Sequence, residues 1–105
     1  MNLYRIENLP QDKELVEQLI PDRGIRIERI ISSGHASPED FWYNQERDEW
    51  VALLQGQAEL SWRDGRQLTM QAGDWVFIPA GEEHRVEWTS EEPPCIWLAV
   101  HGDMS

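Results

Sequence analysis

The spacing of hydrophobic and polar residues along this chain changes at Gly24. Before that residue, the apolar positions fall three and four residues apart, as on one face of a helix. Asp12 and Glu14 would occupy the first helical turn, where negative charge is favourable. The pattern predicts one short helix over residues 10–20, ended by Pro21. Its apolar face would consist of Leu15, Val16, Leu19 and Ile20.

After Gly24 the apolar residues come in short runs that are separated by turn residues. Asp64-Gly65 is typical of a two-residue β-hairpin, and Ala72-Gly73-Asp74 indicates a second turn. Turn signals of this density predict an all-β barrel or sandwich. The expected strands cover residues 25–31, 49–54, 58–62, 68–70, 75–78, 84–88 and 95–101.

Two of these expected strands have no polar side. Trp50 to Leu54 and Trp75 to Ile78 are apolar throughout, whereas a strand with one wet face alternates. Both faces must therefore be covered. One face would meet the barrel interior, and the other would meet the helix, a second sheet or a partner chain. We hypothesise a homodimer with these tryptophans near the interface.

Composition narrows the partners and the compartment. The chain of 105 residues is one domain's length and carries a formal net charge of −11. That charge disfavours nucleic acid and anionic membrane surfaces as partners. We see no secretory or membrane-spanning segment, and the single cysteine, Cys95, cannot form an internal disulfide. Both observations favour the cytoplasm.

Two short patterns surround the most notable polar residues. Gly73 is followed after five residues by Pro79-Ala80-Gly81, and His84 comes two residues later. Upstream, Glu49 is followed after six residues by Gly56. Over residues 25–100 the chain resembles the cupin superfamily, whose two motifs have these spacings. The resemblance implies a small single cupin (jelly-roll) barrel. We expect residues 1–23 to form the helix and an extension, and residues 24–105 to form the barrel.

Cupin motifs usually supply three histidines and one glutamate that hold a divalent metal such as iron, manganese, nickel or zinc. Of these four, only Glu49 and His84 carry over to this chain. The two remaining histidine positions hold Tyr43 and Gln45, or Trp42 and Asn44 if the motif has its longer gap. The resemblance therefore implies an incomplete metal motif.

The expected site leaves three alternatives open. A metal could bind to Glu49 and His84, with Gln45, Tyr43, His101 or His35 as a further donor. Without a metal, the carboxylate and the imidazole would pair in an apolar pocket and act as an acid, a base or a ligand anchor. The third alternative is a buried pair without a function. His101 ends the last expected strand and could equally be a surface histidine.

Aromatic side chains complete the expected pocket. Trp88 replaces the asparagine of the second motif and shares strand parity with His84. Tyr43 occupies the position of the first motif histidine. We expect a ligand pocket formed by Tyr43, Gln45, Glu49, His84 and Trp88. Its function would be the binding of a small polar metabolite, and the alternative is a metal-dependent cupin enzyme of the dioxygenase or isomerase type.

Overall fold

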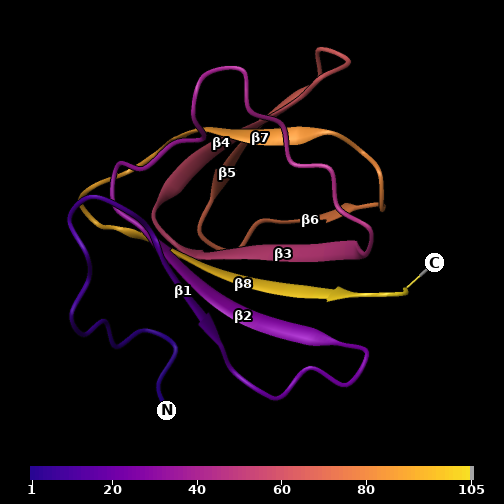
Figure 1. The fold of residues 1–105 in the computed structure, drawn as a ribbon. Coiled ribbons are helices and arrows are strands. Elements are labelled where there is room, and N and C mark those ends of the chain that lie inside the picture. Colours follow the sequence, from indigo (N-terminus) through magenta and orange to yellow (C-terminus); the bar gives the residue numbers. More distant parts are fainter. Residues whose placement is uncertain (105) are drawn as a thin grey trace.

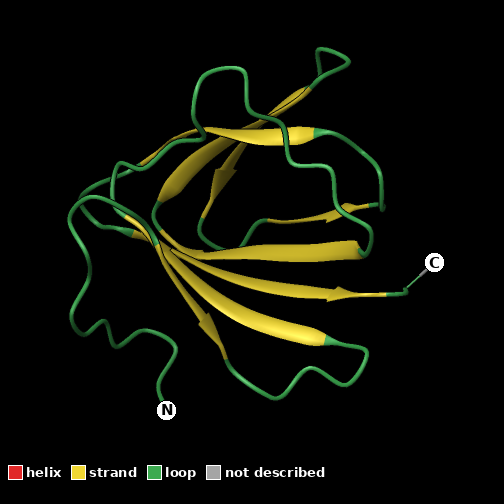
Figure 2. Cartoon of the chain, viewed as in Figure 1, coloured by secondary structure: helices red, strands yellow, loops and turns green. Residues whose placement is uncertain are grey.

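The computed structural model describes residues 1–104, and these residues form eight β-strands (Figures 1 and 2). The strand bounds are β1 Leu15–Gln18, β2 Arg26–Ser32, β3 Asp48–Gln55, β4 Gln57–Trp62, β5 Gln67–Gln71, β6 Trp75–Ile78, β7 His84–Thr89 and β8 Cys95–Gly102. Each run of the sequence that alternated or stayed apolar after Gly24 is a strand, so the all-β prediction is confirmed. Within the described residues no helix is long and apolar enough to cross a membrane.

The strands form two antiparallel sheets that face each other (Figure 1). The larger sheet has the order β1-β2-β8-β3-β6, and the smaller has the order β5-β4-β7. Neighbours in the larger sheet are far apart in sequence. Strand β8 lies between β2 and β3, with Ile30 opposite Trp97 and Val51 opposite Ala99. This arrangement brings residues from both ends of the chain into one interior.

The predicted N-terminal helix is wrong. Residues 15–18 form strand β1, which pairs antiparallel with β2 and places Leu15 opposite Ile31. Without β1, the backbone N–H and C=O groups of β2 would form an open sheet edge, and pairing satisfies them. A partly buried ion pair also favours the strand, since Glu17 in β1 contacts the Arg29 guanidinium on the same face. Short-range spacing could not reveal either long-range partner.

Arg29 also ties the N-terminal segment to the outer face of the larger sheet. It is 3% exposed, and its Nη1 donates to the backbone carbonyl oxygen of Arg5 at 2.6 Å and of Leu3 at 3.2 Å. Buried guanidinium groups require such acceptors because an unpaired buried charge is costly. The segment before β1 therefore covers part of the outer face near β2.

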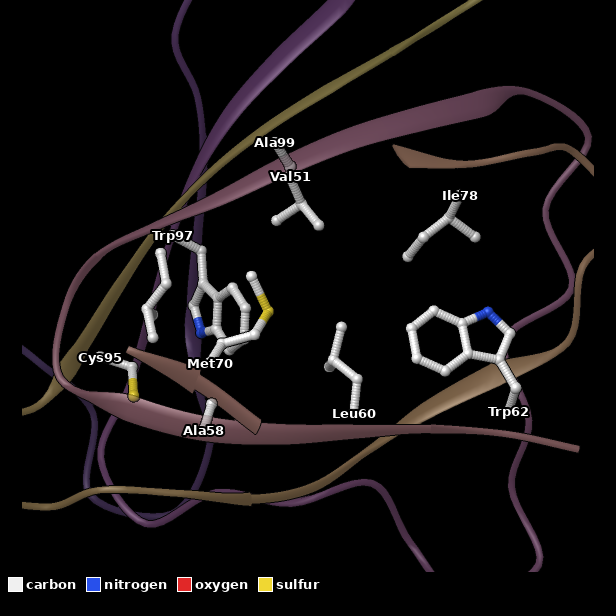
Figure 3. Packing of buried hydrophobic residues seen from close by; sticks show 10 residues of the cluster. Val51, Ala58, Leu60, Trp62, Met70, Ile78, Cys95, Trp97 and Ala99 are labelled. Carbon is white, nitrogen blue, oxygen red and sulfur yellow. The ribbon is translucent and has the colours of Figure 1, made fainter. Parts of the chain in front are cut away.

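The apolar core fills the space between the two sheets, as Figure 3 shows. Trp97 and Val51 point inward from the larger sheet, and Leu60 and Met70 point inward from the smaller one (Figure 3). Leu53 and Met70 are fully buried. Polar side chains can occupy inward positions where the two sheets diverge and the apolar core ends. Such positions lie near the ends of β2, β3 and β8.

The long connection between β2 and β3, residues 33–47, runs beside β7 (Figure 1). Ser37 N donates to Val86 O at 2.9 Å, and Tyr43 forms an isolated antiparallel bridge with His84. These hydrogen bonds let an irregular segment behave as a partial fourth strand of the smaller sheet. The loop is thereby held next to the inward-facing residues of β7.

Candidate functional site

Glu49 and His84 meet inside the barrel, although they belong to different sheets. Glu49 lies in β3, and its side chain points inward like those of Val51 and Leu53. His84 is the first residue of β7. The two residues are 7% and 5% exposed, and His84 Nε2 lies 3.7 Å from Glu49 Oε1. The structure thus brings this carboxylate and this imidazole together.

The other nitrogen of His84 determines what Nε2 can do. Nδ1 lies 3.0 Å from the backbone carbonyl oxygen of Glu82, which can only accept a hydrogen bond. Nδ1 therefore carries a proton. In the neutral ring, Nε2 would then turn a lone pair toward the Glu49 carboxylate. The lone pair and the carboxylate would repel each other. A proton on Nε2, or a hydrogen-bond donor placed between the two groups, removes this repulsion.

Protonation of His84 is favoured by its surroundings. Burial alone would lower the pKa of this imidazole. The facing carboxylate of Glu49, the hydrogen bond to the Glu82 carbonyl and the charge of the Glu82 side chain outweigh burial, and the pKa is raised above its ordinary value of 6.5. His84 therefore holds its second proton closer to neutral pH than a free imidazole would.

A second imidazole and a second carboxylate flank Glu49. His101 in β8 lies opposite Glu49 in β3 and opposite Arg26 in β2. Its Nε2 lies 3.0 Å from Glu28 Oε1 and 3.9 Å from Glu49 Oε2. Because a carboxylate only accepts, the ring nitrogen donates to Glu28. His101 is 3% exposed, so it is an interior histidine and not a surface one.

Glu28 was not among the residues that the sequence singled out. Strand β2 alternates, with Ile27 and Arg29 outward and Glu28 and Ile30 inward. From this alternation, the sequence could have predicted that the Glu28 carboxylate lies on the inward face of the strand. Its partner could not have been found, because His101 is 73 residues away and the pairing of β2 with β8 is not visible in a single sequence.

The loop beside β7 supplies Tyr43 and Gln45. Tyr43 N donates to His84 O at 2.7 Å, and the two rings stack with centroids 5.5 Å apart. Burial raises the pKa of the Tyr43 phenol, and the charges of Glu14 and Glu49 raise it further. Gln45 also borders the interior, and its Oε1 is buried without a hydrogen-bond partner among the described residues.

Trp88 lies outside this pocket, contrary to the expectation from strand parity. A bulge in the pairing of β4 with β7 places Val86 opposite Leu60 but Trp88 opposite Glu59. One extra residue in β7 reverses the inward and outward positions that follow it. Val86 therefore faces the interior with His84, whereas Trp88 turns outward and is 39% exposed.

The interior between the sheets contains a cavity of about 230 Å³. One part of its wall is apolar and includes Ile30, Val51, Leu60, Ile78, Val86 and Trp97. The other part carries the ionisable side chains of Glu14, Arg26, Glu28, Glu49, His84 and His101. An apolar enclosure with a few convergent polar groups is the usual form of a small-molecule site.

Comparison with known proteins identifies the family. Residues 29–101 match the model of the cupin domain. The chain belongs to the cupin family. A crystal structure of a cupin superfamily protein from Desulfitobacterium hafniense DCB-2 aligns over 95% of this chain and 99% of its own, with a TM-score of 0.74 at 17% identity. This second likeness concerns the fold alone.

Two further relatives differ in how much of their own length this chain covers. A Ralstonia eutropha JMP134 protein, provisionally assigned as a mannose-6-phosphate isomerase, is 40% identical, with a TM-score of 0.91 over 99% of this cupin and 97% of its own chain. A membrane protein of Staphylococcus carnosus (strain TM300) is 28% identical over 90 residues. The match covers 86% of this chain but only 23% of that protein's length.

Cupins often hold a metal, but the side chains of this cupin do not form the usual site. Neither alternative for the two missing motif positions, Tyr43 with Gln45 or Trp42 with Asn44, supplies a histidine. Tyr43 and Gln45 are the pair that borders the cavity. His101 could replace one of the missing histidines, yet its Nε2 is directed to Glu28 at 3.0 Å. Among residues 1–104, no group of three or more His, Cys, Asp or Glu side chains has a geometry that could hold a metal ion. This donor set does not fit the family's metal.

Proposed function

We propose that this cupin binds a small polar metabolite in the cavity between its sheets, with Glu49 at the centre of the contact. The observation that carries the proposal is the long distance from this carboxylate to its two imidazole neighbours. Its two imidazole neighbours lie at 3.7 and 3.9 Å, beyond the usual ~3.2 Å limit of an N–H···O hydrogen bond. A hydroxyl or amino group of a ligand placed there could donate to Glu49 while it contacts His84.

The proposal is tested by nuclear magnetic resonance with a ¹⁵N-labelled protein. Glycerol, mannose and a set of related polyols are titrated, and the shifts are mapped. Binding in the cavity should move the signals of Tyr43, His84 and the Trp97 indole. Glu49→Gln should weaken the effect, and Glu59→Gln should leave it unchanged, since Glu59 in β4 is opposite the outward Trp88. Shifts confined to the outer sheet face would contradict the proposal.

A second candidate function is an isomerase that works by proton transfer. A carboxylate between two imidazoles can take a proton from one carbon of a hydroxycarbonyl compound, and a neighbouring imidazolium can donate a proton to oxygen. The 40% identity to the Ralstonia eutropha protein supports this candidate. The test is incubation with mannose 6-phosphate, and separately with mannose, in deuterated water. Enzyme-dependent deuterium exchange next to the carbonyl carbon supports it, and its absence with both sugars contradicts it.

We also propose that the protein is a homodimer that covers the outer face of β3 and β6. Trp50 and Trp75 lie on this face with ring centroids 6.0 Å apart. Trp75 is 60% exposed, and Phe77 is 37% exposed. The predicted helix that could have covered them does not exist. A cluster of large exposed apolar side chains marks an association surface, and a second copy would cover it symmetrically.

A further inference from the structure

We propose that the cavity selects ligands that carry a positive charge, namely small hydroxylated primary amines, and disfavours phosphorylated and carboxylated ones. This inference rests on the proposed binding function of the same cavity. Its starting point is the charge of the lining. Among the described residues, the carboxylates of Glu14, Glu28 and Glu49 border the cavity, against the guanidinium of Arg26 and the imidazole of His84, whose charged form is favoured. Negative charge remains in excess even when His84 is protonated.

The different burial of these charges increases the effect of the negative ones inside the cavity. The Glu28 and Glu49 side chains are 13% and 9% exposed, whereas the Arg26 side chain is 40% exposed. Arg26 Nε is buried, but water screens the exposed part of this side chain, while charges away from water interact more strongly with a ligand. Arg26 is also directed at Glu28, with Nε 3.5 Å from Oε2. The interior therefore presents a negative potential to whatever enters it.

The phenol of Tyr43 lies near two of the same carboxylates. After burial, the charges of Glu14 and Glu49 are the causes that raise its pKa. Tyr43 thus remains neutral and cannot add to the negative charge, but its ring can contact a cation. Aromatic faces attract ammonium groups, and the indole of Trp97 borders the same cavity.

The hydrogen-bond acceptors in the cavity wall also favour a ligand that carries hydrogen-bond donors. The carboxylate of Glu14 accepts from Ser32 Oγ at 3.0 Å, and that of Glu28 accepts from His101. Among residues 1–104, Glu49 lies 3.7 Å and 3.9 Å from the His84 and His101 nitrogens, longer than a usual hydrogen bond. The Oε1 atom of Gln45 is buried without a partner among the described residues. An ammonium group has three donors and no acceptor, so it could serve Glu49 and Gln45 together.

An entering ammonium would also compete with the extra proton of His84. The groups that surround this imidazole are Glu49 from β3, Tyr43 and its stacked ring from the loop, Glu82 from the preceding turn, and His101 from β8 beyond Glu49. A ligand cation beside Glu49 replaces the imidazolium as counter-charge. Binding should therefore release a proton and should strengthen as pH rises above the His84 pKa.

The test uses three ligands of one size that differ in charge: 3-amino-1,2-propanediol, glycerol and glycerate. Each is titrated into the ¹⁵N-labelled protein, and the Tyr43, His84 and Trp97 signals are followed. We expect the amine to bind at least about tenfold more tightly than glycerol, and glycerate to bind most weakly. Binding of glycerol or glycerate as tightly as the amine would overturn the charge inference and leave the binding function standing. No shift with any of the three, up to about 100 mM, would contradict both.

Charge-removing variants locate the effect. Glu28→Gln should reduce the preference for the amine over glycerol about three- to tenfold, because one buried negative charge is lost without a change of shape. Glu59→Gln is the matched control and should keep the wild-type preference. If Glu28→Gln unfolds, Glu14→Gln provides the same test. An amine preference that survives in both cavity variants would overturn the inference.

Discussion

His101 Nε2 lies 3.0 Å from Glu28 Oε1 in the interior of the barrel, although the two residues are 73 positions apart in sequence. The contact exists because β8 pairs with β2 on one side and with β3 on the other. It directs His101 toward Glu28, while His101 Nε2 lies 3.9 Å from Glu49. This division distinguishes the site from the metal-holding arrangement of the family and motivates the predictions that follow.

The first prediction concerns the titration of His84. In the wild-type protein the imidazole should titrate above 6.5, because the groups that favour its charged form outweigh burial. In Glu49→Gln, burial and the two Glu82 contributions remain but the facing charge is gone, so the pKa should fall below that of the wild-type protein. The imidazole ¹³C and ¹H shifts followed from about pH 5 to pH 9 measure both values. Equal pKa values in the two proteins would show that Glu49 does not govern His84.

The same shift predicts how stability depends on pH. A group whose pKa is raised on folding contributes stability that is fully present below the unfolded value and is lost as pH rises through the folded value. The free energy of unfolding should therefore decline as pH rises from 6.5 through the raised pKa of His84. Urea denaturation on either side of this window measures the decline. It should be smaller in Glu49→Gln, and an equal decline in that variant would assign the effect to another group.

The second prediction concerns the metal. Protein purified without chelator or nickel resin should contain well below one equivalent of iron, manganese, nickel or zinc, since the donor set does not fit. The double variant Tyr43→His with Gln45→His returns imidazoles to the two motif positions. Its affinity for Zn²⁺ or Mn²⁺ should rise by about 100-fold or more, because two ligands are added. Metal analysis and calorimetry measure this. A stoichiometric, tightly held metal in the wild-type protein would contradict the prediction.

The third prediction concerns the outer face of β3 and β6. Light scattering at micromolar concentration should give the mass of two chains for the wild-type protein. Trp75→Lys should give the mass of one chain, because it places a charge in the proposed interface. Trp88→Lys is a matched control, since Trp88 is also partly exposed but belongs to the smaller sheet. A monomeric wild-type mass would remove the proposed homodimer.

The fourth prediction compares two glycines with the same backbone requirement. Gly56 and Gly65 have φ of 92° and 103°. An added Cβ at Gly65 meets no atom within 4 Å, whereas at Gly56 it would lie 2.8 Å from Ser90 Oγ and 2.9 Å from Cys95 Sγ. Gly65→Ala should cost about 1–2 kcal/mol from backbone strain. Gly56→Ala should cost about 1–3 kcal/mol more, because the close contacts must be relieved.

Thermal or urea denaturation of the two variants measures this difference. The control for both is the wild-type protein under the same conditions. Equal destabilisation would mean that the structure around Gly56 relaxes freely, and the role of this motif glycine would then be limited to its backbone angle.

Local pattern was sufficient for most of the fold. Apolar runs such as Trp75 to Ile78, bounded by turn residues, became strands because each carries its own period and its own stop signals. The spacing of Glu49, Gly56 and His84 also predicted the family, since turn glycines and strand alternation are short-range properties. Each strand pattern and each of the two motifs spans only about ten residues, so it can be recognised without knowledge of which strands pair.

Only the tertiary structure decided the features that depend on pairing. Residues 15–18 became a strand because β2 offered an open edge and Arg29 offered a partner for Glu17. Trp88 turned outward because one bulge reversed the parity of β7. Glu28 met His101 because β8 lies between β2 and β3. Each of these outcomes depends on the register between distant segments, and that register follows from the energy of the whole assembled sheet.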